Sequence, residues 1–496
     1  MRAYLVGSVS FAMCFVAPLM VACSGDSSIP DAGDDSGADA SADVGSDVVI
    51  PANCDLSADI TASPACIDDG IGVFVDATGG NDTGLGTKAS PFKTIAHAIG
   101  AVGGKPRIYV CAGTYAEDIS LTQSSTVSVY GGLVCGTWKY DGSLPNVGKS
   151  ALALHVDGVT KPIVFSDLTF VAVAGANAGD SSIAALVNAS TDVTLRRVKL
   201  RPAAGKDGKA GVTGSNWTSV AQTDSTIAGH NASGATGATD HACTLCVDSK
   251  NSTGGGGGTG QLTTGTSGND GLPNLNGQSP NDGKGGVGGS CKAGDNGASA
   301  PNGTAAPGAA VVGKLTSAGW TPAPGSDGPN GGAGQGGGGG GGGASVTSPG
   351  GGAGGGCGGC GGAGGKGGGA GGASIGLAVI ASKVTLNTCD IVTLAGGAGG
   401  AGSSGQDGQL GGYAGTASSP GCAGGVGGKG GSGGAGGGGS GGVSVGVLYT
   451  DQKPTVDTAT TIMVPSAPAT KGTGGAAGTN DGIDGVAQAI LQASSS

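Results

Sequence analysis

Glycine at every third position is the feature that most limits what this chain can fold into. The chain has 114 glycines among 496 residues, and from Gly421 to Gly442 a glycine stands at every third residue. A turn of three residues is the period of the polyproline II helix, and only glycine allows two backbones to approach closely on one face. We therefore favour packed, antiparallel, glycine-faced extended helices, and a flexible glycine linker is the alternative. Collagen fits poorly, because the tract from Gly396 to Gly442 contains only Pro420.

Three stretches of the chain are copies of one unit, and glycine-rich sequence follows each copy. The first copy runs from Ser182 to Gly205, the second from Ser374 to Gly396, and a looser third from Ser444 to Gly472. Val193-Thr194-Leu195 in the first copy matches Val384-Thr385-Leu386 in the second. A repeated strand unit with insertions at one fixed point predicts a solenoid that carries its insertions at one corner.

Within the solenoid, we expect coils of about 25 residues. Asp167-Leu168-Thr169-Phe170 aligns with Asp192-Val193-Thr194-Leu195, one such coil further along the chain. This alignment would stack Leu168 on Val193 and Phe170 on Leu195. The alternation of apolar residues changes phase at Arg196-Arg197, which predicts a corner between two strands of one coil.

The segment Gly72 to Tyr115 resembles the opening of right-handed parallel β-helices of the pectin-lyase-like type. It has a strand Val73-Phe74-Val75, a loop containing Asn81-Asp82, and a Gly-Thr-Tyr turn at its end. Ser90 suits an N-cap, with Pro91 as the first helical residue. The face of this helix would consist of Phe92, Ile95, Ala96, Ile99 and Val102. The resemblance implies an all-β fold, a right-handed parallel β-helix with an N-terminal capping helix, interrupted by long glycine-rich, polyproline-II-like insertions.

The segment that ends at Cys23 predicts the compartment. Arg2 precedes an apolar run from Leu5 to Val21, which is typical of a signal peptide. The sequence Leu19-Met20-Val21-Ala22-Cys23 resembles the lipobox of bacterial lipoproteins, although leucine is usual where Met20 stands. Lipidation of Cys23 would anchor the chain to a membrane, and Ser24 favours the outer membrane or cell surface. The alternative is cleavage after an alanine without lipid.

The chain divides into eight expected parts. They are a signal peptide 1–22, an acidic disordered tether 23–52, cap and β-helix rungs 53–205, a glycine-rich insertion 206–373, a rung 374–395, a second insertion 396–443, a rung 444–472 and a glycine-rich tail 473–496. An acidic tether and glycine-rich (PGRS-like) insertions are similar to those of surface lipoproteins of the myxobacterial type, most of which have no assigned activity.

Eleven cysteines remain beyond Cys14 and Cys23, an odd number for an oxidising compartment. Cys389 aligns with Val198, so we expect it to be unpaired and buried. Cys54 with Cys66, and Cys111 with Cys135, are expected local bridges. The other candidates for disulfides are Cys243, Cys246, Cys357, Cys360, Cys291 and Cys422. The Cys-x-x-Cys pairs could alternatively form a four-thiolate zinc site, but we favour disulfides and expect no metal.

The charge pattern is unfavourable for nucleic-acid binding, because the net charge is −11 and no basic stripe is present. Resemblance to the pectin-lyase-like type raises the possibility of a polysaccharide lyase or hydrolase, which would need carboxylates on one exposed face. The best candidates are Asp167 and Asp192 beside Arg196 and Arg197, as a calcium or uronate site; a solvated strand start is the alternative. The histidines His97, His155, His230 and His241 show no metal-binding spacing.

The sequence thus predicts no catalytic site and no cofactor. We expect a non-enzymatic, lipid-anchored surface protein with a structural or adhesive role, which could contact extracellular polysaccharide or other surface components. The alternative is a calcium-dependent polysaccharide lyase or hydrolase, or a polysaccharide-binding module, on the β-helix face.

Overall fold

The computed structural model describes residues 50–275, 279, 281–289, 291–476 and 478–493. The predicted signal peptide, the Cys23 lipidation site and most of the predicted tether lie outside these residues. Among the described residues, none of the helices has the length and apolarity to span a bilayer. The 3-10 helix η1 (Pro64–Cys66) and the helix α1 (Ile95–Gly100) precede most of the strands.

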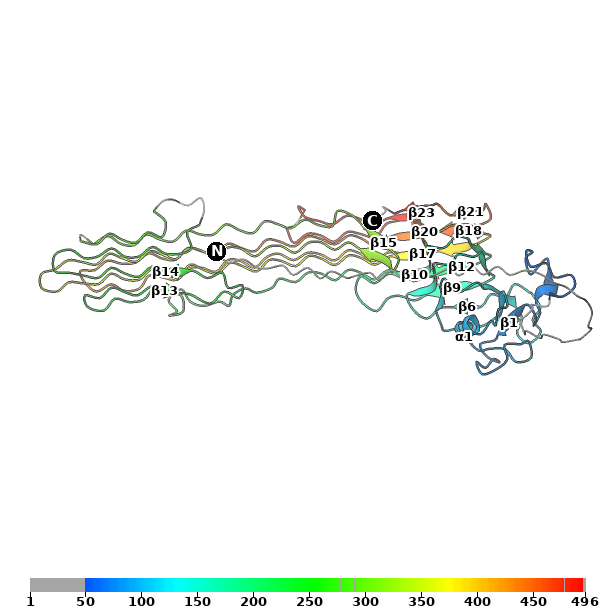
Figure 1. Cartoon of the computed structure of the whole chain (residues 1–496). Helices are drawn as coiled ribbons and strands as arrows, with labels where there is room; N and C mark the ends of the chain where they lie inside the picture. Colours follow the sequence, from blue (N-terminus) through cyan, green and yellow to red (C-terminus); the bar gives the residue numbers. More distant parts are fainter. Residues whose placement is uncertain (1–49, 276–278, 280, 290, 477, 494–496) are drawn as a thin grey trace, which may run out of the picture. The chain divides into compact units, whose positions relative to one another are not determined.

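Three parallel sheets form the right-handed parallel β-helix that the sequence predicts (Figure 1). Sheet A contains, in spatial order, β1 (Gly72–Val75), β2 (Arg107–Cys111), β5 (Ser128–Leu133), β8 (Ile163–Ser166), β11 (Val193–Arg196), β18 (Val384–Asn387) and β21 (Thr455–Val456). Sheet B contains β3 (Thr114–Tyr115), β6 (Asn146–Val147), β9 (Thr169–Ala172), β12 (Lys199–Pro202), β19 (Asp390–Val392) and β22 (Thr461–Met463). Sheet C contains β4 (Ile119–Leu121), β7 (Leu152–Asp157), β10 (Ser182–Asn188), β17 (Ser374–Ile380), β20 (Ser444–Tyr449) and β23 (Ala487–Gln492). Two antiparallel hairpins are separate from these sheets, β13 (His241–Ala242) with β14 (Thr253–Gly254) and β15 (Gly313–Thr316) with β16 (Gly319–Pro322).

The matched copies stack directly on one another. Ser182 pairs with Ser374 and Ser374 pairs with Ser444, while Val193 pairs with Val384. Each insertion leaves the solenoid after a sheet B strand (β12, β19 or β22) and returns at a sheet C strand. The insertions therefore all occur at the corner between sheets B and C. The predicted tail also contributes β23, which pairs with β20 and extends sheet C.

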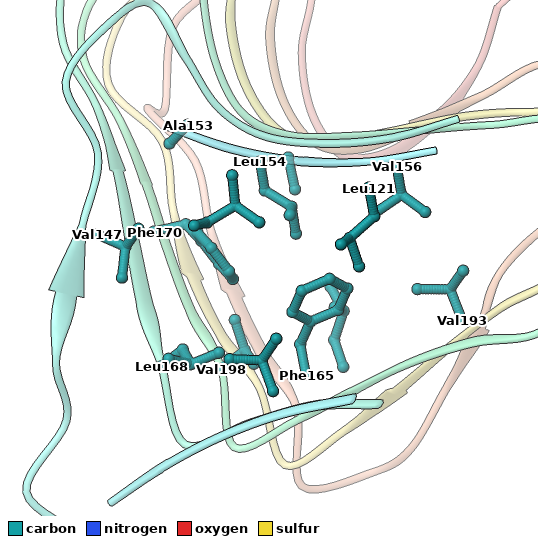
Figure 2. Packing of buried hydrophobic residues seen from close by; sticks show 14 of the residues in the cluster. Leu121, Val147, Ala153, Leu154, Val156, Phe165, Leu168, Phe170, Val193 and Val198 are labelled. Atoms are coloured by element: carbon teal, nitrogen blue, oxygen red, sulfur yellow. The ribbon is translucent and has the colours of Figure 1, made fainter. Parts of the chain in front are cut away.

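The interior of the coil is filled by apolar side chains from all three sheets (Figure 2). Leu154 from sheet C, Phe165 from sheet A and Phe170 from sheet B point into it, and each is at most 1% exposed. The rings of Phe165 and Phe170 meet edge to face at 5.9 Å. Burying a side chain of this kind contributes about 2 kcal/mol to folding.

The predicted coil length is wrong for the rungs that carried it. Val193 pairs with Ile163, not with Leu168, and Leu200 pairs with Phe170, so this coil is longer than predicted. Leu168 stacks next to Val198, because the Lys199 N–H donates to the Leu168 carbonyl. The two tetrapeptides are similar in sequence but lie at different places in the coil. The one beginning at Asp192 lies in sheet A, whereas the one beginning at Asp167 enters sheet B. The corner at Arg196-Arg197 is confirmed, since β11 ends at Arg196 and Arg197 has a φ of +51°.

The glycine-rich segments pack side by side as extended chains (Figure 1). We call the extended segments within 203–373, 393–443 and 464–486, apart from the β15–β16 hairpin, the glycine bundle. In it, successive N–H groups donate to different neighbours: Gly337 to Gly356, Gly338 to Asp295 and Gly339 to Asn269. The next three residues repeat the sequence with Ala353, Lys292 and Thr266. This period of three is that of the polyproline II helix, which has no internal hydrogen bonds and so leaves its backbone groups free to bond to neighbouring segments.

Neighbouring segments of the glycine bundle run parallel in some cases and antiparallel in others. Residues 350–373 run antiparallel to 325–343 but parallel to 421–442, as the bonds from Gly356 to Gly425 and from Gly359 to Gly428 show. The prediction of antiparallel packing is therefore right for some neighbours only. Glycine is required by close approach: a Cβ on Gly355, Gly358 or Gly361 would lie closer than 3.0 Å to a carbonyl oxygen of 331–337.

Candidate functional site

The two aspartates proposed as a carboxylate pair do not come together. Because the coil is longer than predicted, Asp167 lies level with Arg197, and its N–H donates to the Arg196 carbonyl at 3.0 Å. Asp192 lies before β11, where its half-exposed carboxylate is 3.5 Å from Lys383. The predicted stacking of Asp167 on Asp192 is wrong, and the two carboxylates belong to separate ion pairs.

Asp167 is enclosed in a network that uses both of its carboxylate oxygens. Its side chain is 2% exposed. Arg197 donates to it from Nε and Nη2, both at 2.7 Å, in the bidentate geometry that suits guanidinium and carboxylate. Tyr140 donates its hydroxyl at 2.9 Å, and Ser166 at 2.7 Å. A carboxylate with these four donors is held in place rather than presented to a substrate.

Asp59 joins the two adjacent arginines to the N-terminal segment. Its carboxylate accepts from Arg196 Nη1 at 2.7 Å and lies 3.0 Å from Arg197 Nη2. Burial acts to raise the pKa of Asp59, but the hydrogen bonds from Thr61, Arg196 and Arg197 outweigh it and hold that pKa well below its usual range. The basic corner is therefore neutralised by the chain itself.

The single glutamate of the chain has a structural position. The Glu117 carboxylate accepts from the N–H groups of Ile95 and Ala96, both at 2.8 Å, at the start of α1. Thr94 is the N-cap, so the helix begins later than the predicted start at Ser90 and Pro91. Phe92 instead forms a β-bridge with Val75. A negative group at these unpaired donors stabilises the cap.

All ten candidate cysteines are in disulfides, and Cys389 is free and buried. Two bridges are the expected local ones, Cys54–Cys66 and Cys111–Cys135. Three others join segments of the glycine bundle that are far apart in sequence: Cys243–Cys357, Cys246–Cys360 and Cys291–Cys422. Burial raises the pKa of the Cys389 thiol to about 11.

The spacing Cys-x-x-Cys has a geometric reason in the bundle. Three residues are one polyproline II turn, so both cysteines of each pair face the same neighbouring segment, about 9 Å apart. Each cysteine then bridges to its counterpart, 243 to 357 and 246 to 360. One zinc ion cannot bind four sulfurs placed this way, since zinc–sulfur bonds are about 2.3 Å. His241 does lie near Cys243 and Cys357, but that pair is oxidised.

Two cavities in the described part of the chain differ in chemistry. A polar one of about 330 Å³ is lined by hydroxyl, amide and ring groups that include Ser225, His230, Asn231 and Tyr413. An apolar one of about 470 Å³ lies between the β15–β16 hairpin and β23, where Trp320 and Leu491 line it.

A histidine pair in the bundle escaped the sequence analysis. The rings of His230 and His241 stack with centroids 4.4 Å apart. His230 Nδ1 pairs with the Thr239 hydroxyl, and His241 Nδ1 with the Ala228 carbonyl. The two histidines are separated by a turn and form no recognisable motif, so only the fold could reveal this pair.

The comparisons with known proteins agree with the fold. A protein-family model described as "Protein of unknown function (DUF1565)" matches residues 78–236, and that family is associated with parallel β-helix proteins. Among curated proteins there is no match, and among solved structures there is none either. The chain is thus similar to this family over α1 and the first coils.

Proposed function

We propose that the protein is a lipid-anchored component of the bacterial cell surface with a structural or adhesive role and no enzymatic activity. The observation that carries the proposal is the glycine bundle, whose segments are joined to one another by backbone hydrogen bonds and by three disulfides. In such an assembly, the contacts between segments are made by backbone groups and disulfides. It suits a spacer more than a catalyst.

The length of the bundle segments supports a spacer role. At about 3.1 Å per residue, an extended segment such as 350–373 spans about 70 Å. Each disulfide that closes a long loop of the bundle restricts the unfolded chain strongly. A β-helix with such a bundle could hold an adhesive surface away from the membrane to which Cys23 is attached.

Replacement of Cys23 by serine tests the anchor. Cells that express the full chain are fed an alkyne fatty acid, and the protein is examined for the label and for its place in the envelope. We expect label in the unchanged chain and none in Cys23→Ser, which should be released in soluble form. Equal labelling of both chains, or no labelling of either, would contradict lipidation at Cys23.

Contact with polysaccharide is a second candidate function, favoured by the polar cavity beside Tyr413. Hydroxyl, amide and aromatic groups are those that bind sugars. The full chain is incubated with pectin or alginate in the presence of calcium. Release of unsaturated uronates would overturn the non-enzymatic proposal, whereas retention on the polymer without cleavage, reduced by Tyr413→Ala, would favour a binding role.

A further inference from the structure

The two ends of the β-helix are finished differently. At the N-terminal end, α1 packs against β1, β2 and β4. At the C-terminal end, β21, β22 and β23 are each the last strand of their sheet, and among the described residues no strand pairs with their outer edges. Unpaired strand edges present N–H and C=O groups that recruit another strand.

The apolar column inside the coil is also open at this end. Val456, Ile462 and Ile490 are the last residues of the column, and they are only partly buried. Their counterparts one coil earlier, Leu386, Ile391 and Val447, are fully buried, at 0% exposure. The side chains at these positions are therefore partly exposed in the last coil, because no further coil covers them among the described residues.

Two of the features that normally prevent pairing, charge and proline, are absent from the open edges. The strand β23, with the sequence AQAILQ, contains no charge and no proline, and neither do β21 and β22. Ala489 in β23 is exposed, and Met463 in β22 is 56% exposed. Natural edge strands usually carry a lysine, a proline or a bulge that blocks association.

We propose that a second copy of the chain covers this end, so that two β-helices join through their C-terminal coils. A single extended peptide would satisfy only one of the three edges, whereas another coil end satisfies all three. The N-terminal end of a neighbour is closed by α1, which leaves the C-terminal end of an identical chain as the matching surface.

Twofold symmetry fits the strand lengths. With the axis near Ala489, β23 meets its own copy in antiparallel orientation, and the two copies of Ala489 lie next to the axis. The same axis exchanges sheets A and B, so the short β21 meets the short β22 of the second copy, and the reverse. The contact closes on itself, which predicts a dimer and no longer polymer.

The mass of the full-length protein in solution tests the inference, by sedimentation at several micromolar concentrations. We expect a dimer for the unchanged chain and a monomer for Ala489→Lys, because the contact would enclose two lysines beside the twofold axis. Ala305→Lys, at an exposed alanine in the glycine bundle, is the matched control and should remain dimeric. Met463→Lys is a second variant in case Ala489→Lys misfolds.

A cysteine variant gives an independent readout. Ala489→Cys should form an intermolecular disulfide under mild oxidation, because the two copies of this residue lie next to the axis, whereas Ala305→Cys should not. A monomer in the unchanged chain, a dimer that survives both lysine substitutions, or a ladder of larger species would overturn the inference.

Discussion

The β-helix and the glycine bundle differ in what lies between their neighbouring segments. In the β-helix, side chains such as Phe165 and Leu386 fill an enclosed core, and the strands around that core pair through their backbones in parallel sheets. In the glycine bundle, the side chain is absent at the contact, and the carbonyl of one segment occupies the place where a Cβ would stand. Both regions use backbone hydrogen bonds, but the β-helix adds an enclosed apolar core, whereas the glycine bundle relies on close contact between backbones.

The difference extends to covalent links. The β-helix region uses short-range bridges, with sequence separations of 12 and 24 residues. The bundle uses bridges with separations of 114 and 131 residues. A region with little apolar area to bury depends more on restricting the unfolded chain.

Removal of the paired bundle disulfides should have the largest effect. Cys243–Cys357 and Cys246–Cys360 close nearly the same loop, so either one keeps most of the restriction. Loss of one bridge, by Cys246→Ser with Cys360→Ser, should cost less than about 1 kcal/mol, while loss of both should cost about 4 kcal/mol. Chemical denaturation measures both; equal, additive costs would contradict the shared loop.

A large-to-small change in the β-helix should cost nearly as much. Phe165→Ala leaves a cavity in the enclosed core and should lower the free energy of unfolding by about 3 to 4 kcal/mol. The exposed Val212 in the glycine bundle is the control, and Val212→Ala should change stability by less than about 0.5 kcal/mol. Similar losses at both sites would mean that the two regions do not differ in how they use apolar side chains.

A small-to-large change should reverse this pattern. Gly358→Ala places a Cβ against the Gly334 carbonyl and should cost about 3 kcal/mol, because a backbone must shift. At Gly214 the nearest atom is 3.6 Å from the new Cβ, so Gly214→Ala should be neutral or slightly stabilising. Thermal unfolding compares the two, and tolerance of alanine at Gly358 would argue against close packing.

Acid should weaken the junction at Asp59 before it affects the glycine bundle. The folded pKa of Asp59 is depressed, so its contribution is present above its unfolded pKa of about 4 and is lost as pH falls through the folded value. Asp59→Asn should remove about 1.5 kcal/mol at pH 7 and reduce the loss of stability below pH 4. Urea midpoints measured from pH 7 to pH 2 test this, and an unchanged acid limb would exclude Asp59 as its source.

The smallest effect concerns Cys389. Its buried thiol should not react with a thiol reagent at pH 8 until the β-helix unfolds, because burial raises its pKa to about 11. Cys389→Val, which imitates the stacked Val198, should change stability by less than about 1.5 kcal/mol. Rapid labelling of the native protein would place this residue outside the enclosed column.

Sequence reasoning succeeded where a pattern repeats locally. The copies predicted the register of Ser182, Ser374 and Ser444, and the glycine period predicted extended chains with three residues in each turn. It failed where a coil changes length: the tetrapeptides beginning at Asp167 and Asp192 look alike, yet they lie on different sheets. The ion pair between Asp167 and Arg197 depends on the longer coil, which no local pattern encodes.

Long-range partners were also beyond the reach of the sequence. The two Cys-x-x-Cys pairs allowed a zinc site or disulfides, and only the packing of 357–360 beside 243–246 selects the cross-links. Similarly, β23 lies in a segment that composition assigns to a glycine-rich tail, and its pairing with β20 depends on the return of the chain to sheet C.

Hydrogen exchange of the backbone amides tests the central claim most directly, namely that the glycine bundle is an ordered, hydrogen-bonded assembly. Peptides covering residues 350–373 are compared with those covering β10 in the intact, oxidised protein. We predict slow exchange in both, because Gly355, Gly356 and Cys357 each donate to a different neighbouring segment. Complete exchange of 350–373 at the rate of an unstructured chain, with β10 still protected, would contradict the account.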